Sequence, residues 1–187
     1  MRKSPDNENF PDCWVRVAGL DIHYKCLGQG PPVVLLHGGG NDWHEWIKNL
    51  DVIARDFQVF ALDLPGFGAS QAPDTTVSPS WYVMFLKNFL DSLGITRTHL
   101  IGHSISGMIS IAFAVRYPDS VNKLVIVDAS GLGKISQTGW LLISIFRILD
   151  RWKRKGRGLK TDGPNEEWLV LDKLPEVKNP VLIVWGQ

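Results

Sequence analysis

Short apolar runs recur along the chain and alternate with stretches of helical periodicity. The runs are rich in Val, Ile and Leu and lie at Val33–Leu36, Val59–Leu62, Leu100–Ile101, Leu124–Val127 and Val181–Trp185. Such runs are typical of parallel strands that are covered on both faces. Between them, apolar residues follow helical spacing at Asp42–Ile53, Trp81–Leu93 and Ile105–Val115. This alternation predicts an α/β fold with a doubly wound, mostly parallel sheet.

Two parts of the chain depart from this rhythm. Trp14–Ala18 and Ile22–Leu27 alternate apolar and polar side chains, which predicts an antiparallel hairpin. The segment from Gly131 to Pro175 combines an amphipathic stretch, a basic run and a polar loop, so we interpret it as a short helical cap inserted over the strand ends. The predicted organisation is an N-terminal arm at 1–13, a core at 14–130, a cap insertion at 131–175 and the start of the C-terminal core strand at 176–187.

Composition narrows the classes of protein that fit this pattern. The chain has 187 residues, of which 44% are hydrophobic, enough for one domain with a buried core. Its net charge of +1 argues against a chain-wide basic surface for nucleic acid. With only two cysteines, neither a disulfide framework nor a four-ligand zinc site is expected. The polar N-terminus has no apolar secretory segment, so a reducing, cytoplasmic location is expected.

The strongest chemical signal is the run Gly102-His103-Ser104-Ile105-Ser106, which lies between an apolar strand and a helix of small residues. This is the context of the G-x-S-x-G nucleophile elbow, in which a strained turn presents a serine hydroxyl at the edge of the sheet. Ser106 stands where the motif has its second glycine, and because serine is small we expect a slightly tighter elbow. The alternative interpretation is an ordinary helix start made of small residues.

A second signal, His37-Gly38-Gly39-Gly40, also follows a strand. Glycines let the backbone approach a ligand closely and turn its N–H groups inward. An acyl-transfer enzyme needs two such donors for the oxyanion that develops during the reaction. The residue after the serine, Ile105, is the candidate for one donor, and Gly39 is the candidate for the other. Taken alone, the glycine-rich loop would be interpreted as a tight connector.

Together these motifs make residues 14–187 resemble the α/β-hydrolase superfamily, of the serine-nucleophile type with an inserted cap. The resemblance is carried, in chain order, by His37–Gly40, Asp63–Ser70, Gly102–Gly107, Leu124–Asp128 and Pro180–Gly186. It implies that Ser104 is the nucleophile and that Gly39 and Ile105 supply the oxyanion hole. It also implies that Asp63–Ser70 shapes a loop more often than it touches substrate, and that His37 holds the oxyanion loop by hydrogen bonding.

The rest of the expected catalytic triad is absent from the sequence after Ser104. A serine needs a histidine base held by a carboxylate, and in this fold the chain order is serine, acid, histidine. All five histidines precede Ser104. The family places the acid after the strand matched by Val181–Trp185 and the histidine one strand later, so we expect the chain to be C-terminally incomplete. Asp128 is a candidate acid at a strand end, where a plain turn residue is the favoured interpretation.

The expected function is a serine hydrolase of an ester-like or related carbonyl substrate, small and apolar. Relatives that open epoxides carry aspartate at the elbow, whereas serine favours acyl transfer or hydrolysis of a carbon–carbon bond. The alternative is a truncated or non-catalytic binding module. The chemistry implies no metal and no organic cofactor. The 140–157 segment could touch a membrane surface, although a lid helix with a solvated basic tail is favoured.

Overall fold

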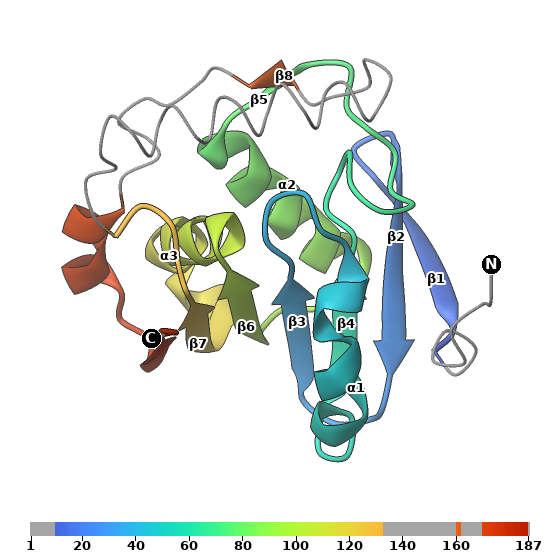
Figure 1. Ribbon diagram of the computed structural model, residues 1–187, viewed down its shortest axis with the longest axis horizontal. Coiled ribbons are helices and arrows are strands. Elements are labelled where there is room, and N and C mark those ends of the chain that lie inside the picture. The colour runs from blue at the N-terminus through green and yellow to red at the C-terminus, as the bar shows by residue number, and fades with distance from the viewer. Residues whose placement is uncertain (1–9, 133–159, 162–169, 187) are drawn as a thin grey trace.

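A seven-stranded, mostly parallel sheet forms the centre of the molecule (Figure 1). The computed structural model describes residues 10–132, 160–161 and 170–186. The strand order is β1-β2-β4-β3-β6-β7-β9. The five strands β4, β3, β6, β7 and β9 run parallel to one another, while β2 is antiparallel to both β1 and β4. The predicted doubly wound, mostly parallel α/β fold is thereby confirmed.

The parallel strands coincide with the predicted apolar runs and extend most of them. Their bounds are β3 Pro32–Leu36, β4 Gln58–Leu62, β6 Thr98–His103, β7 Val121–Val127 and β9 Val181–Val184. In β3 and β4 every residue after the first is buried. These strands read as continuous apolar runs because helices cover both of their faces.

The antiparallel hairpin begins earlier in the chain than the sequence predicts. It consists of β1 Asp12–Val17 and β2 Leu20–Leu27, with Asp12 opposite Lys25. Asp12 and Cys13 therefore belong to the sheet, and the boundary predicted for an arm at 1–13 is wrong at this end. Phe10 is also buried, with its ring centroid 6.1 Å from that of Trp43 in an edge-to-face contact. Because the N-terminal residues are mostly polar, the sequence pattern did not predict this packing.

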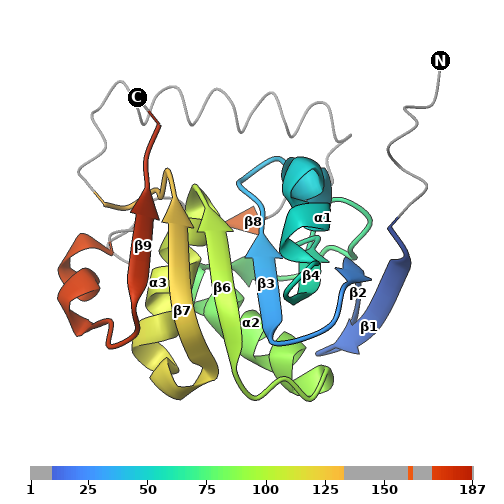
Figure 2. The ribbon, with the colours of Figure 1, turned by 90° about the horizontal axis from the view of Figure 1, so that it is seen from below.

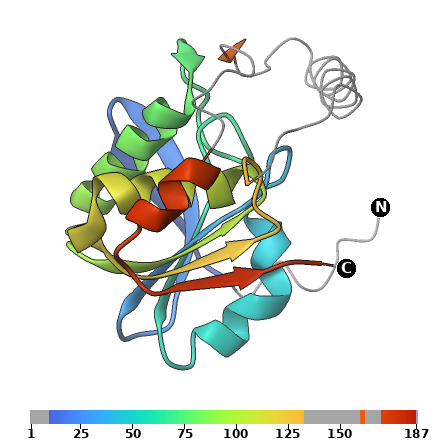
Figure 3. The same ribbon diagram turned by 90° about the vertical axis from the view of Figure 1, so that its left-hand side faces the viewer.

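Helices cover the two faces of the sheet, as Figures 2 and 3 show. One face carries η2 Trp43–Trp46 and α1 Ile47–Ile53, which together fill the predicted helix from Asp42 to Ile53. The other face carries α2 Pro79–Ser92 and α3 Ile105–Arg116. Two hydrophobic clusters result, one under each layer. The smaller cluster includes Trp43, Trp46 and Leu50, and the larger one includes Phe89, Met108 and Phe113.

The predicted cap insertion lies mostly outside the described residues. Its described parts are β8 Lys160–Thr161, which pairs in parallel with β5 Thr76–Val77, and the short helix η5 Leu171–Glu176. The N–H of Val170 donates to the carbonyl of Gly131, with an N–O distance of 3.0 Å, and Val170 is fully buried. The C-terminal end of the predicted insertion thus packs on the core beside α3. The 140–157 segment considered for membrane contact falls on residues that are not described.

Within the described part of the chain, no helix is both long enough and apolar enough to cross a bilayer.

Candidate active site

Ser104 lies at the turn between β6 and α3, where the elbow motif predicts it. Its backbone has φ +53° and ψ −118°, a conformation that residues other than glycine rarely adopt. Its N–H donates to the carbonyl of Val127 at 2.9 Å, and its carbonyl accepts from Ser130 at 3.0 Å. Bonds to the neighbouring strand and the loop after it therefore hold the strained turn in place. The hydroxyl Oγ lies 3.3 Å from Ser130 Oγ, a contact that the sequence analysis did not single out.

The residues around Ser104 are small because the elbow is packed against its neighbours. A Cβ on Gly102 would collide with the carbonyl oxygen of Ser106, and one on Gly107 would lie 2.6 Å from the Cβ of Ala129. Ser106 itself is fully buried, and its Oγ donates to the carbonyl of His37 at 2.5 Å. The serine that replaces the motif's second glycine thus binds α3 to the glycine-rich loop.

His37 anchors the beginning of that loop and has no exposed surface. Its Nε2 accepts from the N–H of Leu64 at 3.1 Å, so its Nδ1 carries the proton and donates to the carbonyl of Gly38 at 2.7 Å. Burial lowers the pKa of His37, and its bond to Gly38 and the nearby Asp63 charge oppose that shift only in part. A neutral imidazole that uses both nitrogens for structure cannot also serve as the base of a reaction.

The backbone N–H groups of Gly39 and Ile105, near Ser104, have no hydrogen-bond partner among the described residues. Ile105 is the first residue of α3, so its N–H has no acceptor within the helix. A Cβ on Gly39 would lie 3.7 Å from Cγ2 of Ile105, which brings the loop against the start of the helix. This arrangement could hold an anion between the two donors.

Glu45, a residue that the sequence analysis did not single out, lies beside the elbow. One of its carboxylate oxygens is 2.6 Å from His103 Nδ1. The carboxylate also accepts from the N–H of Gly38 at 3.1 and 3.2 Å and from Asn41 Nδ2 at 2.5 Å. The imidazole of His103, in β6, thus contacts a carboxylate on η2. Nothing in the pattern of apolar positions sets this acid apart from other helix residues, so only the tertiary structure reveals it.

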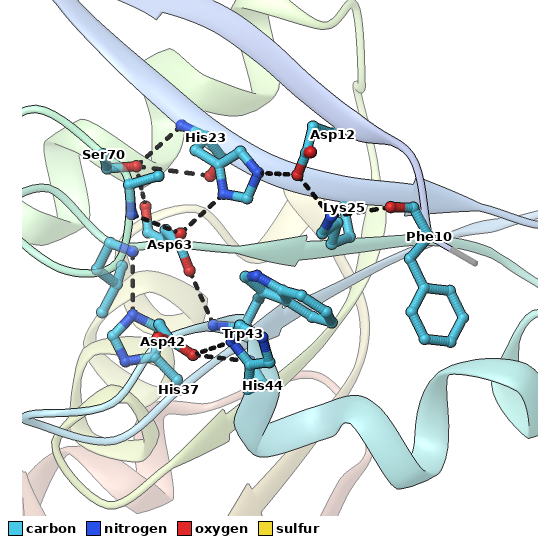
Figure 4. Close-up of polar contacts among 12 residues, drawn as sticks. Phe10, Asp12, His23, Lys25, His37, Asp42, Trp43, His44, Asp63 and Ser70 are labelled. Atoms are coloured by element: carbon cyan, nitrogen blue, oxygen red, sulfur yellow. Dashed lines mark hydrogen bonds and ion pairs between the residues drawn. The ribbon is translucent and has the colours of Figure 1, made fainter. Parts of the chain in front are cut away.

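A buried polar network joins the hairpin to the loop after β4 (Figure 4). Asp63 is 1% exposed, accepts from the N–H groups of Trp43 and Ala69 at 2.8 and 2.9 Å, and lies 2.7 Å from Nδ1 of His23. The other ring nitrogen of His23 lies 2.8 Å from Asp12. The motif around Asp63 shapes the backbone here, and none of these contacts involves Ser104.

Lys25 completes this network at the edge of the sheet. Its buried Nζ donates to the carbonyl of Phe10 at 2.8 Å and to Asp12 at 2.5 Å, and it lies 4.6 Å from the ring centroid of Trp43. The hydrogen bonds from Lys25 and His23 lower the pKa of the Asp12 carboxyl. A cavity of about 490 Å³ opens beside the network, and neither Ser104 nor Gly39 lines it.

Asp128, the candidate acid, lies at the end of β7 with a left-handed φ of +44°. Its Oδ1 accepts from the N–H of Gly186 at 2.7 Å, and its own N–H donates to the carbonyl of Val184 at 2.9 Å. Within the described residues it contacts no histidine. This geometry is that of a residue that closes the end of two adjacent strands.

The remaining histidines have other partners than the Ser104 hydroxyl. His99 is in β6 with its ring centroid 5.3 Å from that of Phe57, and burial followed by the charges of Lys123 and Arg97 lowers its pKa. His44 is on η2, with Nδ1 2.7 Å from Asp42. Among the described residues, no histidine forms a hydrogen bond with Ser104 Oγ.

Comparisons with known proteins bear on the family and the fold of this chain. Residues 31–154 match the model of the alpha/beta hydrolase fold family. The chain is 37% identical to epoxide hydrolase 4 of Mus musculus over 62% of this chain and 34% of that protein. It is 33% identical to 2-hydroxy-6-oxo-6-phenylhexa-2,4-dienoate hydrolase of Comamonas testosteroni, over 89% of this chain and 74% of that protein.

A solved structure extends the likeness of the fold. The meta-cleavage product hydrolase of Pseudomonas fluorescens superposes with a TM-score of 0.70 at 22% identity, covering 93% of this chain and 79% of that one. The chain spans about a third of epoxide hydrolase 4, so these comparisons bear on the part of the fold that it contains. From the order of the strands, the elbow and the matched family model together, the chain belongs to the alpha/beta hydrolase fold family.

Proposed function

We propose that this chain carries the nucleophile and oxyanion hole of a serine hydrolase that cleaves an ester-like or related carbonyl substrate, small and apolar. One observation carries the proposal. Ser104 has φ +53° at a strand-to-helix turn, and the unpartnered N–H groups of Ile105 and Gly39 lie beside it. Strained backbone at such a turn persists only where surrounding bonds hold it, and it is concentrated at functional sites.

The proposed reaction begins when Ser104 Oγ attacks the carbonyl carbon. The carbonyl π bond opens onto oxygen, and the N–H groups of Gly39 and Ile105 stabilise the resulting oxyanion. The N-terminus of α3, a helix of 12 residues, points its positive end at the same place. The serine proton must pass to a base. The leaving group departs with a proton as the acyl-enzyme forms, and water then releases the acid.

The type of nucleophile favours one of the two groups of named relatives. The chain is similar both to epoxide hydrolases and to 2-hydroxy-6-oxo dienoate hydrolases. Family members that open epoxides carry aspartate at the elbow, whereas this chain carries Ser104. A serine adds to carbonyl carbons, so the proposed substrate contains a carbonyl group next to the bond that is cleaved.

The absence of a histidine at Ser104 among the described residues favours a second candidate, a module that binds the substrate without turning it over. The two candidates differ in rate. An oxyanion hole and binding alone leave about 10³–10⁴-fold acceleration over water when the triad is disabled. We therefore expect the 187-residue chain to hydrolyse activated short-chain esters slowly and to react slowly with a fluorophosphonate probe.

The experiment measures p-nitrophenyl acetate and butyrate hydrolysis together with fluorophosphonate labelling mapped by mass spectrometry. The proposal expects label on Ser104 and loss of both signals in Ser104→Ala. Ser130→Ala is the matched control, because Ser130 is the neighbouring hydroxyl 3.3 Å away and should retain most of the rate. Hydrolysis that survives Ser104→Ala would contradict the proposal, and saturable binding of ester analogues without label would favour the binding module.

A further inference from the structure

Glu45 lies at the centre of a polar cluster, formed with Gly38, Asn41 and His103, between the glycine-rich loop and the elbow. Its side chain is 15% exposed. Its carboxylate accepts hydrogen bonds from the N–H of Gly38 and from the side-chain amide of Asn41, and one oxygen contacts Nδ1 of His103. A carboxylate removed from water is costly unless donors surround it. Hydrogen bonds to an ionised acceptor are also stronger than neutral ones. The cluster therefore combines a partly buried charge with the donors that stabilise it.

The cluster holds the backbone polar groups of Gly38 at the start of the loop. The carbonyl of Gly38 accepts from His37 Nδ1 and from the N–H of Asn41 at 3.3 Å, while its N–H is bound by Glu45. Both backbone polar groups of Gly38, its N–H and its carbonyl, are thus held. The next N–H along the chain, that of Gly39, has no partner among the described residues.

Glu45 is itself held in place from a second direction. It lies on η2, whose first residue Trp43 donates its N–H to the buried carboxylate of Asp63 at 2.8 Å. The loop from Gly38 to Asn41 therefore has an anchor at each end, His37 before it and η2 after it. Glu45 adds the bonds from η2 back to the loop.

The same side chain connects the loop to the nucleophile. His103 directly precedes Ser104, and a Cβ on Gly38 would lie 2.8 Å from His103 Nδ1 and 3.3 Å from the Cβ of Ser104. Loop and elbow are therefore in direct contact through Gly38. We infer that Glu45 is a positioning residue: its carboxylate fixes Gly38 against the His103-Ser104 turn, so that the free N–H of Gly39 is held next to Ile105. Its catalytic consequence rests on the proposed function.

The first test needs no catalysis. Backbone amide hydrogen exchange of Gly38 is measured by NMR in the wild-type chain and in Glu45→Ala, Glu45→Gln and Asp91→Ala. Asp91 is a control because its carboxylate pairs with Lys87 on the surface of α2. The inference expects exchange at Gly38 to rise tenfold or more in Glu45→Ala, less in Glu45→Gln, which keeps an acceptor oxygen, and not in Asp91→Ala. The amide of Leu100 in β6 should keep its protection throughout. Unchanged exchange at Gly38 would overturn the inference.

The second test measures the rate that depends on Ser104. Glu45→Ala should lower kcat about tenfold with KM within about twofold, because a displaced donor acts on the transition state more than on the bound ester. Glu45→Gln should recover part of the loss. Faster exchange at Gly38 with an unchanged rate would contradict the positioning role while leaving the proposed function intact. If Ser104→Ala has no effect on any rate, the proposed function fails, and the exchange result alone still decides whether Glu45 holds the loop.

Discussion

The hydroxyl of Ser106 donates a 2.5 Å hydrogen bond to the carbonyl oxygen of His37, two residues that lie 69 positions apart in the chain. Both are fully buried. The bond joins the first turn of α3 to the last position before the glycine-rich loop. A glycine at position 106, as the elbow motif has it, could not make this bond. The departure from the motif therefore adds an attachment between the two halves of the candidate site.

Replacing Ser106 with alanine should lower the free energy of unfolding by about 1–3 kcal/mol, the cost of leaving a buried group without its partner. Here that group is the His37 carbonyl. Ser106→Gly should cost about as much or slightly more, because glycine adds its own penalty of roughly 0.5–1 kcal/mol within a helix. Urea denaturation followed by tryptophan fluorescence measures both variants.

Ser110→Ala is the control for this experiment. Ser110 is equally buried in α3, but its Oγ donates to the carbonyl of Ser106 within the same helix. Its loss should cost less than that of Ser106, since the acceptor lies in the regular bonding pattern of the helix. Equal losses for the two serines would contradict a special role for the bond to His37.

Gly68→Ala should destabilise the protein by several times as much as Gly94→Ala. Both glycines have left-handed backbone, with φ +52° and +67°, so alanine at either position costs about 1 kcal/mol of strain. A Cβ on Gly68 would also collide with the carboxylate of Asp63, whereas nothing lies within 4 Å of one on Gly94. Overpacking adds about 1–3 kcal/mol. Thermal unfolding of the two variants measures the difference, and equal midpoints would contradict the close packing at Asp63.

His37 should make the folded state less stable as the pH falls. Burial lowers its pKa in the folded protein below the ordinary value of 6.5, so the unfolded chain binds more protons between the two pKa values. The stability contribution is present above pH 6.5 and is lost as the pH drops toward the folded pKa. The free energy of unfolding of wild type and His37→Gln, measured at pH 7.5 and 5.5, should show a smaller decrease on acidification in the variant.

His99 gives a graded comparison for that measurement. Its pKa is shifted in the same direction, but its ring is only partly buried, so His99→Gln should change the pH dependence less than His37→Gln does. The Asp12 carboxyl, whose pKa the hydrogen bonds from Lys25 and His23 lower below its ordinary value of 3.8, titrates below this pH range. Identical pH dependence in wild type and His37→Gln would show that the imidazole is not desolvated as described.

The β9 edge should drive self-association of the 187-residue chain. Its apolar side chains are unusually exposed: Leu182 is 58% exposed and Ile183 is 52% exposed. The strand pairs with β7 on one side and has no partner among the described residues on the other. Exposed, uncharged edge strands pair with one another. Light scattering coupled to size exclusion, over a range of concentrations, should show oligomers that Ile183→Lys reduces.

Val52→Lys is the matched control. Val52 is 59% exposed, but it lies on α1 and offers no strand edge. Its substitution adds the same charge and should leave the oligomer distribution unchanged. A wild-type chain that stays monomeric at all concentrations, or an equal response to both lysines, would contradict pairing through β9.

The sequence alone determined the layers of the fold and the place of the elbow. Continuous apolar runs indicate strands that are covered on both faces. Apolar residues that recur with the helical period of 3.6 residues indicate the helices between them, so both kinds of element follow from the local pattern. The elbow at Ser104 and its flanking glycines could be predicted because a strained turn at the end of a strand tolerates few residue types. For the same reason the two candidate donors, Gly39 and Ile105, were assigned by their places in the motifs.

Only the tertiary structure decided which polar side chains cooperate. Glu45 contacts Gly38 and also His103, which is 58 positions further along the chain. The fold likewise joins Asp63 to His23 and Ser106 to His37. Such bonds depend on where separate elements cross, and a polar residue on a helix face looks the same in sequence whether it faces water or a loop. Phe10 and Asp12 were misplaced in an arm for that reason, because their partners Trp43 and Lys25 come from other elements.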